Sequence, residues 1–441
     1  MESYDVIVIG AGMAGLLTAY YLQQEGKDVL ILEAKEIASG QTGRTTAKIT
    51  SQHGLKYTEL TDKIGSETAC LYAKANEEAI DQYEELIRKE AIACHFKRVS
   101  SYLYTRDENK ISDLKREADL AFLYDINAYF TKKTELSFEV AGAVCFENQA
   151  QFDADSFVEE LAFKLKIKEN SKVIKIRGNK CIVEYNCKTE RYRADNIIVT
   201  THYPFKNIPG FYFLRQHQER SYVAALAGGD NVRNMYYGID DDGISFRQKG
   251  DILLFGSGSR RTGEYPCVDS YHKILEQTQL YYPNAKIENV WSAQDCMPHD
   301  GISFIGRYSI FTPHLFVATG FQKWGMSTSM VAAQILRDKI CGRRNEYLKV
   351  FSPWRLHIRA GWRGFGKDTM VSTKGLFRGI WKGKILKEVP CCTHLGCGLH
   401  FNREEQIWEC ACHGSRFDVE GNICDNPAER KLKMQRSRHR R

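Results

Sequence analysis

The chain has 441 residues, of which 43% are hydrophobic and 27% are charged. These proportions are typical of a globular protein with a sizeable core, and the length allows two or three domains. The net charge is +7, and 18 Lys and Arg against 9 Asp and Glu follow residue 350. That basic part has no stripe of basic residues with interleaved aromatics, so nucleic-acid binding is not expected. No apolar run is long enough to span a bilayer and no signal-peptide pattern is present, so we expect no transmembrane segment and a cytoplasmic location.

Residues 5–33 (DVIVIGAGMAGLLTAYYLQQEGKDVLILE) predict a dinucleotide-binding unit made of a strand, a glycine turn, an amphipathic helix and a second strand that ends in an acid. Gly10 permits the tight turn, Gly12 lets the backbone approach a pyrophosphate, and Gly15 allows the helix to pack closely on the strand. The helix N-terminus supplies free N–H groups for phosphates, and Glu33 is expected to bind ribose hydroxyls. A glycine-rich turn without a nucleotide is the alternative.

Residues 36–54 (EIASGQTGRTTAKITSQHG) follow this unit and are rich in Gly, Ser and Thr. The segment resembles the corresponding part of the glycine oxidase, sarcosine oxidase and D-amino-acid oxidase family, where it runs along the FAD pyrophosphate to the isoalloxazine. The resemblance therefore implies FAD rather than NAD, and it allows His53 to lie beside the flavin ring. An ordinary polar loop is the alternative for any single residue. The positions that the resemblance places along the cofactor are Ser39, Gly40, Thr42, Gly43, Arg44, Thr45 and Thr46.

Residues 66–90 have apolar side chains at helical spacing and predict a structural amphipathic helix. A strand followed by a helix is expected within 101–126, and alternating apolar and polar residues between 228 and 259 predict strands of a substrate-domain sheet. By the resemblance, residues 1–350 form an α/β body. A doubly wound, Rossmann-like FAD-binding domain interleaves there with an α+β substrate domain.

Three later stretches, residues 171–205, 291–307 and 313–336, extend the same resemblance through the body. By analogy with the family, the first stretch brings a strand near the adenine and a Thr-Thr turn beside the cofactor. The last stretch predicts a strand, a glycine turn and a helix whose N–H groups point at the flavin edge where reduction builds negative charge. The positions that the resemblance marks are Val173, Thr200, Thr201, His202, Asp300, Gly306, Gly320, Gly325 and Met326.

The resemblance also implies a reaction. In the family, a flavin takes a hydride equivalent from the carbon beside an amine, and water hydrolyses the resulting imine. The protein supplies orientation, a dry pocket and a cation for a substrate carboxylate. Candidates for that cation are Arg247 and Lys323, although each is more often a surface charge.

The C-terminal part begins with residues 351–381, which are rich in Gly, Arg and Lys and predict an irregular connection. Beyond it, Cys392, His394, Cys410 and His413 follow the pattern C-x-H, fifteen residues, C-x-x-H. Two thiolates and two imidazoles are the ligand set of a Rieske [2Fe-2S] cluster, in which the imidazoles raise the reduction potential. A tetrahedral zinc site is the alternative.

The segments CTHLGC and CACHGSRF resemble the two cluster loops of Rieske proteins, and Asn426-Pro427-Ala428 stands where that family has its third, proline-containing loop. The resemblance implies a disulfide between the extra cysteines of the two loops, Cys397 and Cys412. Such a bond is unusual in a reducing compartment.

Rieske domains usually rest on a larger antiparallel β-base, which brings them to about 100 residues. Here residues 377–389 are the only upstream stretch that looks like a strand, and the chain ends soon after the third loop. We therefore expect a small, shortened all-β Rieske domain over residues 382–434 and a basic tail at residues 435–441.

Together, these patterns predict an FAD-dependent oxidoreductase. It is expected to be a dehydrogenase that oxidises an amine or amino acid at the flavin and passes electrons to the cluster and then to an unknown acceptor. One alternative is an NAD(P)H-linked flavin reductase, but its second glycine turn has only a weak candidate at Gly256-Ser257-Gly258, where Arg261 replaces the third glycine. Another is an FAD-binding protein whose Rieske module acts as a redox sensor or a structural element.

Overall fold

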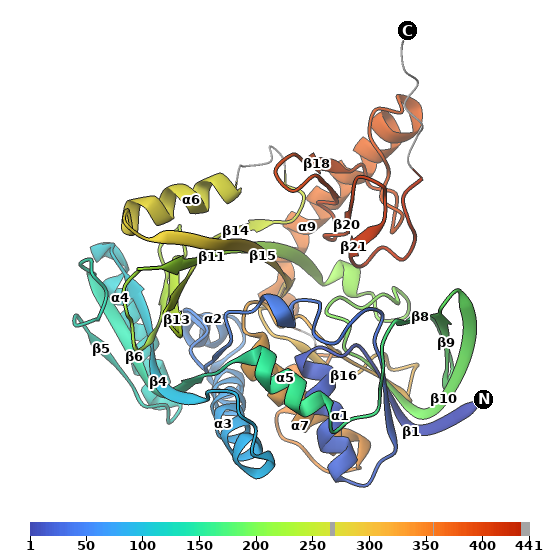
Figure 1. Cartoon of the computed structure of the whole chain (residues 1–441), viewed down its shortest axis with the longest axis horizontal. Coiled ribbons are helices and arrows are strands. Elements are labelled where there is room, and N and C mark those ends of the chain that lie inside the picture. Colours follow the sequence, from blue (N-terminus) through green and yellow to red (C-terminus); the bar gives the residue numbers. More distant parts are fainter. Residues whose placement is uncertain (265–269, 356, 434–441) are drawn as a thin grey trace.

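The computed structural model describes residues 1–264, 270–355 and 357–433, which form three β-sheets (Figure 1). The first sheet has the order β16-β17-β10-β1-β2-β7, and the β8–β9 hairpin joins it through β10. Its central pairings are parallel, and β16 is antiparallel to β17. The strands are β1 (Glu2–Ile9), β2 (Val29–Leu32), β7 (Ile167–Lys168), β8 (Ser171–Arg177), β9 (Lys180–Tyr185), β10 (Lys188–Val199), β16 (Phe304–Arg307) and β17 (Leu315–Thr319).

The apolar strands of this sheet are buried on both faces. In β1, Val6 and Val8 belong to one hydrophobic core, whereas Ile7 and Ile9 belong to another. The first core holds α1 (Met13–Gln24), α3 (Ser66–Glu90), α5 (Ala154–Ala162) and α7 (Gly325–Ile340). The expectation of an amphipathic α1 is wrong, because the helix lies between the sheet and other helices and is buried along most of its length.

The second sheet is large and mostly antiparallel, as expected for a substrate domain. Its order is β15-β11-β14-β13-β12-β4-β6-β3, and β5 pairs with β6. The strands are β3 (Lys48–Ile49), β4 (Lys97–Thr105), β5 (Ala128–Thr131), β6 (Gly142–Gln151), β11 (Gln216–Ala227), β12 (Met235–Gly238), β13 (Ser245–Lys249), β14 (Ile252–Arg261) and β15 (Lys286–Pro298). Other elements of this part of the chain are α2 (Lys56–Lys63), α4 (Ile111–Leu123), α6 (Ser270–Tyr281) and the 3-10 turns η1 (Thr42–Arg44), η2 (Glu108–Lys110) and η3 (Tyr212–Leu214).

Because strands of the two sheets alternate along the chain, the expected interleaved α/β body is confirmed. The small all-β domain is also confirmed. Its sheet has four short strands in the order β18 (His400–Asn402), β19 (Ile407–Glu409), β20 (Arg416–Phe417) and β21 (Ile423–Asp425). The expected basic tail, residues 435–441, lies outside the described residues. None of the helices in the described ranges is long and apolar enough to cross a membrane.

The segment between body and C-terminal sheet differs from the expectation. The short α8 (Leu348–Phe351) is followed by the long α9 (Ile358–Arg378) and by a π-helical turn, η4 (Gly379–Ile385). Figure 1 shows α9 running from the body to the C-terminal sheet. The irregular connection and the strand at 377–389 are therefore wrong predictions. The helix continues through its glycines, and tertiary packing requires small residues there: a Cβ at 375 or 379 would collide with Cys412 or the backbone of Gly396, and one at 364 would lie 3.1 Å from His299.

The packing of α1 on β1 yields a stability prediction for Gly15. A Cβ there would lie 2.0 Å from the Gly10 carbonyl oxygen, so Gly15→Ala must displace the turn and is expected to lower the free energy of unfolding by about 1–3 kcal/mol. Gly366→Ala is the control, because a Cβ at Gly366 in the exposed part of α9 meets nothing within 4 Å. The control should keep or slightly raise stability. Urea unfolding midpoints measure both, and an unchanged midpoint for Gly15→Ala would contradict the close packing.

Candidate functional site

A cavity of about 970 Å³ is lined by residues of both the Rossmann-like domain and the second sheet. Such a volume suits a large organic cofactor together with a small substrate. Its walls contain much of the cofactor site expected from the sequence. The predicted residues that line it are Gly10, Gly12, Glu33, Ser39, Gly40, Thr42, Arg44, Thr45, Thr46, Val173, Thr200, Thr201, His202, Lys323, Gly325 and Met326.

The end of the cavity at α1 is shaped for phosphates. Gly12 is the N-cap of α1 and makes no side-chain cap, so the first turn of the helix presents its N–H groups. The Met13 N–H donates to Thr42 Oγ1 at 3.1 Å, which ties the loop of residues 36–54 to the helix. Gly10 has a φ of +109°, and a Cβ there would lie 2.9 Å from the Thr200 carbonyl oxygen. A dinucleotide pyrophosphate fits this cradle, and larger residues would fill it.

Several residues that the sequence predicted at the cofactor site do not line the cavity. Among the described residues that line the cavity, Gly15, Gly43, Gly306 and Gly320 are not found. Gly15 and Gly43 lie against backbone carbonyls, and Gly306 and Gly320 adopt φ values of +138° and +76°. These four glycines set the path of the backbone near the cavity, but none of them lines it. Asp300, also marked from the sequence, pairs with Arg355 instead, with 2.7 Å between Asp300 Oδ2 and Arg355 Nε.

Arg247 is placed unfavourably for substrate binding. Its buried side chain extends from β13 and donates hydrogen bonds to the carbonyl oxygens of Thr46 and Phe152 and to Gln151 Oε1. Burial lowers the pKa of its guanidinium to about 10. Arg247 is absent from the described lining of the cavity, so its donors hold backbone together and the candidate role moves to Lys323.

Lys323 lines the cavity just before α7, together with Asp295 from β15. Burial raises the pKa of Asp295 to about 7, against the opposing effect of the Lys323 ammonium group. Burial acts to lower the pKa of Lys323, but Tyr237, Glu219 and Asp295 together hold it above its usual value. The site therefore combines a cation with a carboxyl group that titrates near neutral pH.

His53 does not lie in the cavity wall as the structure describes it. Its Nδ1 is 2.7 Å from the Tyr72 hydroxyl and its Nε2 is 2.8 Å from the Thr50 carbonyl oxygen, so both ring nitrogens are occupied. The ring stacks on Trp324 at 4.7 Å, and Trp324 does line the cavity. His53 therefore supports a wall residue.

The sequence patterns missed aromatic and polar residues of the wall. Tyr222, Tyr237 and Trp324 line the cavity beside Lys323. Tyr237 lies in the expected strand region and Trp324 just before the expected helix, but no prediction covered β11, which carries Tyr222. Nothing in the spacing of these residues shows which of them faces the cavity. Asp295 lies in the marked stretch 291–307, where the resemblance pointed to Asp300 instead.

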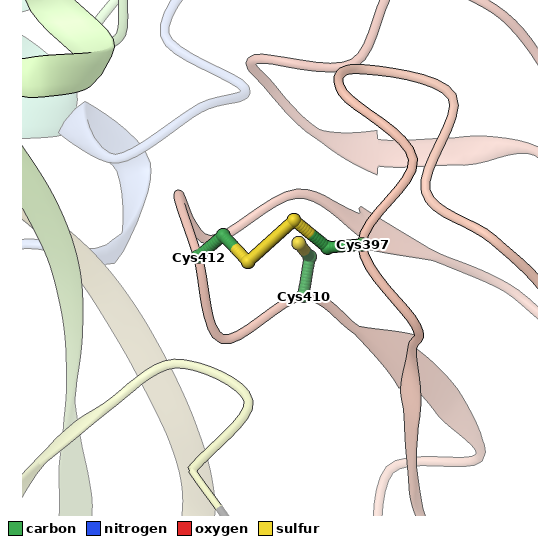
Figure 2. A group of neighbouring side chains, drawn as sticks. All are labelled: Cys397, Cys410 and Cys412. Atoms are coloured by element: carbon green, nitrogen blue, oxygen red, sulfur yellow. A yellow bond between two sulfur atoms is a disulfide. The ribbon is translucent and has the colours of Figure 1, made fainter. Parts of the chain in front are cut away.

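The C-terminal sheet carries two loops that bring the predicted cluster ligands together. Cys392 and His394 precede β18, and Cys410 and His413 lie between β19 and β20. The rings of His394 and His413 are perpendicular, with centroids 4.9 Å apart. A hydrogen bond with Cys410 lowers the pKa of the Cys392 thiol to about 7. Figure 2 shows the disulfide between Cys397 and Cys412 with the Cys410 sulfur beside it, so the predicted disulfide is confirmed.

The donor set fits an iron–sulfur cluster. Nδ1 of His394 and Nδ1 of His413 are buried and have no hydrogen-bond partner among the described residues, which is costly unless the atoms bind something else. The thiols of Cys392 and Cys410, which belong to the same two loops, are also buried. Nε2 of His394 is 2.8 Å from Asn207 Oδ1 of the body, which orients the ring. The roles of these four ligands remain predictions.

The C-terminal domain also contributes to the large cavity. Asn426, Ala428, Glu429 and Arg430, in and after the predicted third loop, line the same cavity as Gly10 and Gly12. The third loop is fixed to the second cluster loop by the Ala428 N–H, which donates to Ser415 Oγ at 3.0 Å.

Two glutamines of the second sheet donate hydrogen bonds to loops of the C-terminal domain. Gln218 Nε2 donates to the carbonyl oxygens of His413 at 2.7 Å and Asn426 at 2.9 Å. Gln294 Nε2 donates to the Gly414 carbonyl oxygen at 2.9 Å. The body therefore hydrogen-bonds to the loop that carries one predicted ligand and to the loop that lines the cavity.

Comparisons with known proteins agree with this geometry. Residues 5–339 match the model of the FAD-dependent oxidoreductase family DAO, and residues 363–436 match that of the Rieske [2Fe-2S] domain. The second range begins inside the segment that the sequence assigned to a connection, so α9 belongs largely to the matched domain. Because the Rieske domain binds a [2Fe-2S] cluster, this match favours iron over zinc.

Full-length similarity supports the same assignment. The chain is 30% identical over 474 residues to a protein of Bacillus subtilis (strain 168) named "Putative Rieske 2Fe-2S iron-sulfur protein YhfW", with 98% of this chain and 93% of the relative covered. "Probable oxidoreductase OrdL" of Haemophilus influenzae is 25% identical over 80% of this chain and 86% of its own length.

Solved structures share the fold of the body. Glycine oxidase from Geobacillus kaustophilus superposes with a TM-score of 0.67 at 17% identity over 81% of this chain and all of its own. L-proline dehydrogenase from P. horikoshii also gives 0.67, at 16% identity over 80% of this chain and 98% of its own. From the matched body, the cavity and the C-terminal loops we conclude that the chain belongs to the DAO family of FAD-dependent oxidoreductases, binds FAD, and carries a C-terminal Rieske [2Fe-2S] domain.

Proposed function

We propose that the protein is a dehydrogenase that oxidises an amine or amino acid at the flavin and passes the electrons to its own Rieske cluster. The observation that carries the proposal is the shared wall: Asn426 and Ala428 of the Rieske domain line the cavity that Gly10 and Gly12 also line. Gln218 donates hydrogen bonds both to the carbonyl oxygen of His413 in a cluster loop and to that of Asn426 in the cavity wall. The arrangement favours transfer within one chain.

The residues of the cavity suit this reaction. When bound, FAD supplies the two-electron oxidation of the substrate C–H bond, and the cluster supplies one-electron transfer. Lys323 offers a cation for a substrate carboxylate, and Asp295 offers a carboxyl group for the amine. Trp324, Tyr222 and Tyr237 line the same cavity and offer aromatic surface to the apolar part of a substrate. The imine product leaves for hydrolysis, which releases a carbonyl compound and ammonia or an amine.

The reductase alternative is disfavoured by the position of its glycine turn. Gly256 and Gly258 lie inside the continuous strand β14 rather than between a strand and a helix. No helix begins there to bind a second pyrophosphate within the described residues around β14. The sensor or structural alternative remains the second candidate, because the four strands of the Rieske sheet are only two or three residues long.

An anaerobic titration tests the proposed electron route. Addition of an amine or amino-acid substrate should bleach the flavin absorbance and then produce the electron paramagnetic resonance signal of a reduced Rieske cluster without an added carrier. The rate of cluster reduction should not depend on protein concentration, because donor and acceptor share one chain. A flavin that bleaches while the cluster stays oxidised would refute the internal route.

The Cys410→Ser variant is the control for this titration. Loss of a predicted thiolate ligand should abolish the cluster signal and leave flavin bleaching by substrate intact. If no tested amine or amino acid bleaches the flavin of the wild-type protein, the sensor or structural role is favoured instead.

Lys323→Gln tests the carboxylate-binding role. Loss of a charged hydrogen bond in a buried site costs about 1.5–3 kcal/mol, so the Kd for an amino acid should rise about 10- to 150-fold. The Kd for the matching amine without a carboxylate should change little. Lys349→Gln is the control, because Lys349 pairs with Glu67 on the surface. Equal losses for both ligands would contradict the assignment.

Asp295→Asn tests the shifted carboxyl group. The pKa of Asp295 in the folded chain is about 7, raised from 3.8 mainly by burial. Between these values the folded state binds more protons than the unfolded state, so the contribution of Asp295 to stability falls as pH rises through this window. Urea unfolding midpoints at about pH 5 and about pH 8 should differ less in Asp295→Asn than in the wild type. The exposed Asp119→Asn is the control, and an unchanged difference in Asp295→Asn would contradict the burial effect.

A further inference from the structure

The helix α9 has an unusual outer surface. Among the described side chains of α9 and η4, eight large apolar ones are between 40% and 70% exposed: Trp362, Phe365, Met370, Leu376, Phe377, Ile380, Trp381 and Ile385. We call this set the outer face. Single exposed apolar residues are ordinary, but a contiguous apolar patch on a helix marks an interaction site. Within the described part of the chain, no core cluster includes these side chains.

The opposite side of α9 fixes the orientation of the outer face. Cβ atoms at Gly375 and Gly379 would collide with Cys412 Sγ and with the Gly396 carbonyl oxygen, and a Cβ at Gly364 would lie only 3.1 Å from His299. These glycines therefore let the helix lie directly on the body and on the cluster loops. The helix cannot rotate its apolar side inward without losing that close packing.

A polar cluster holds the same inner side. Asp368 Oδ2 is 3.1 Å from His217 Nδ1 and 3.3 Å from His299 Nε2, and Asp368 Oδ1 pairs with Arg261. Arg261 also donates to the carbonyl oxygens of Ala411 and Cys412 in the second cluster loop. Asp368, the one acidic residue of α9, is thus used for docking to the body and adds no negative charge to the outer face.

The charge along the rim of the outer face is positive. Lys367, Lys374, Lys382 and Lys384 are exposed on α9 and η4. Of these lysines, Lys382 lies 3.8 Å from the exposed Glu388. A helix with exposed aromatic residues on one side, lysines at its edges and little overall hydrophobicity is typical of segments that lie in the plane of a membrane interface. Trp and Phe suit the headgroup boundary, and the lysines suit anionic headgroups.

We propose that the outer face of α9 and η4 binds the surface of a membrane rich in anionic lipids, with the helix parallel to the bilayer plane. The rest of the molecule stays outside the hydrocarbon. Since the inner side of α9 touches Cys412, the cluster loops lie about one helix diameter, roughly 10 Å, from the lipid.

Vesicle sedimentation with the holoprotein, loaded with FAD and iron, tests the proposal. The wild-type protein should bind vesicles of equimolar phosphatidylglycerol and phosphatidylcholine at least about tenfold more tightly than vesicles of phosphatidylcholine alone, and added salt should weaken the binding. Equal binding to both vesicles, or no binding to either, would overturn the proposal.

Two pairs of substitutions locate the surface. Phe377→Ser with Trp381→Ser, and separately Lys374→Glu with Lys382→Glu, should each reduce binding to the anionic vesicles at least about tenfold. The control pair is Phe122→Ser with Phe163→Ser, because those phenylalanines are 76% and 91% exposed but lie on α4 and directly after α5. The control should bind like the wild type, and equal losses in all three proteins would overturn the assignment to α9.

Two further measurements keep the result interpretable. FAD content, iron content and flavin reduction should be unchanged in all variants, which shows that the fold is intact. A variant that fails this check is replaced by the single change Trp381→Ser.

Size-exclusion chromatography tests whether a second copy of the chain, rather than a membrane, covers the outer face. A wild-type dimer that Phe377→Ser with Trp381→Ser converts to a monomer, together with no vesicle binding, would show an interface between copies and overturn the membrane proposal.

Discussion

A buried network of charges between β11, β14 and the Rieske domain determines how the two parts of the chain meet. Arg220 is 1% exposed and lies 2.6 Å from Glu405 and 3.0 Å from Glu409, and Arg416 pairs with the same two glutamates and with Asp425. Arg260 lies 3.6 Å from Glu409. Removal of one partner from such a network leaves an uncompensated charge and costs about 3–5 kcal/mol. The network therefore stabilises the docked orientation of the Rieske domain that the structure shows.

That orientation turns the imidazole side of the cluster site toward the body. Phe213 lies against the rings of both His394 and His413, at 6.1 and 5.8 Å between centroids, and Asn207 hydrogen-bonds to His394. The disulfide side instead meets α9, where Gly375 lies against Cys412. The cluster site is thus enclosed by the flavin-binding body on one side and by a helix on the other. The ligand set alone identifies a cluster site, and it is this position that brings the site next to the flavin-binding body.

Much of the molecule could be predicted from local patterns. The turn at Gly10 and Gly12 and the paired cluster loops depend on residues close in sequence, because a phosphate cradle and a cluster loop are each built by a short segment. The long helix α9 was harder to predict, because its composition is typical of a loop. The glycines of α9 suggested an irregular connection, whereas tertiary packing against His299 and Cys412 requires small residues there. Propensity is a weak guide when a helix must approach another surface closely.

By itself, the amino-acid sequence indicated the two cofactor classes, the interleaved α/β body and the disulfide between Cys397 and Cys412, because its short motifs carry the resemblance to two families that implies them. Only the tertiary structure decided that Arg247 is bound to backbone carbonyls while Lys323 faces the cavity. It also brought Gln218, distant in the sequence, against the loops of His413 and Asn426. The physical reason is that the direction of a side chain and the pairing of distant strands depend on packing across the whole chain, which no local pattern records.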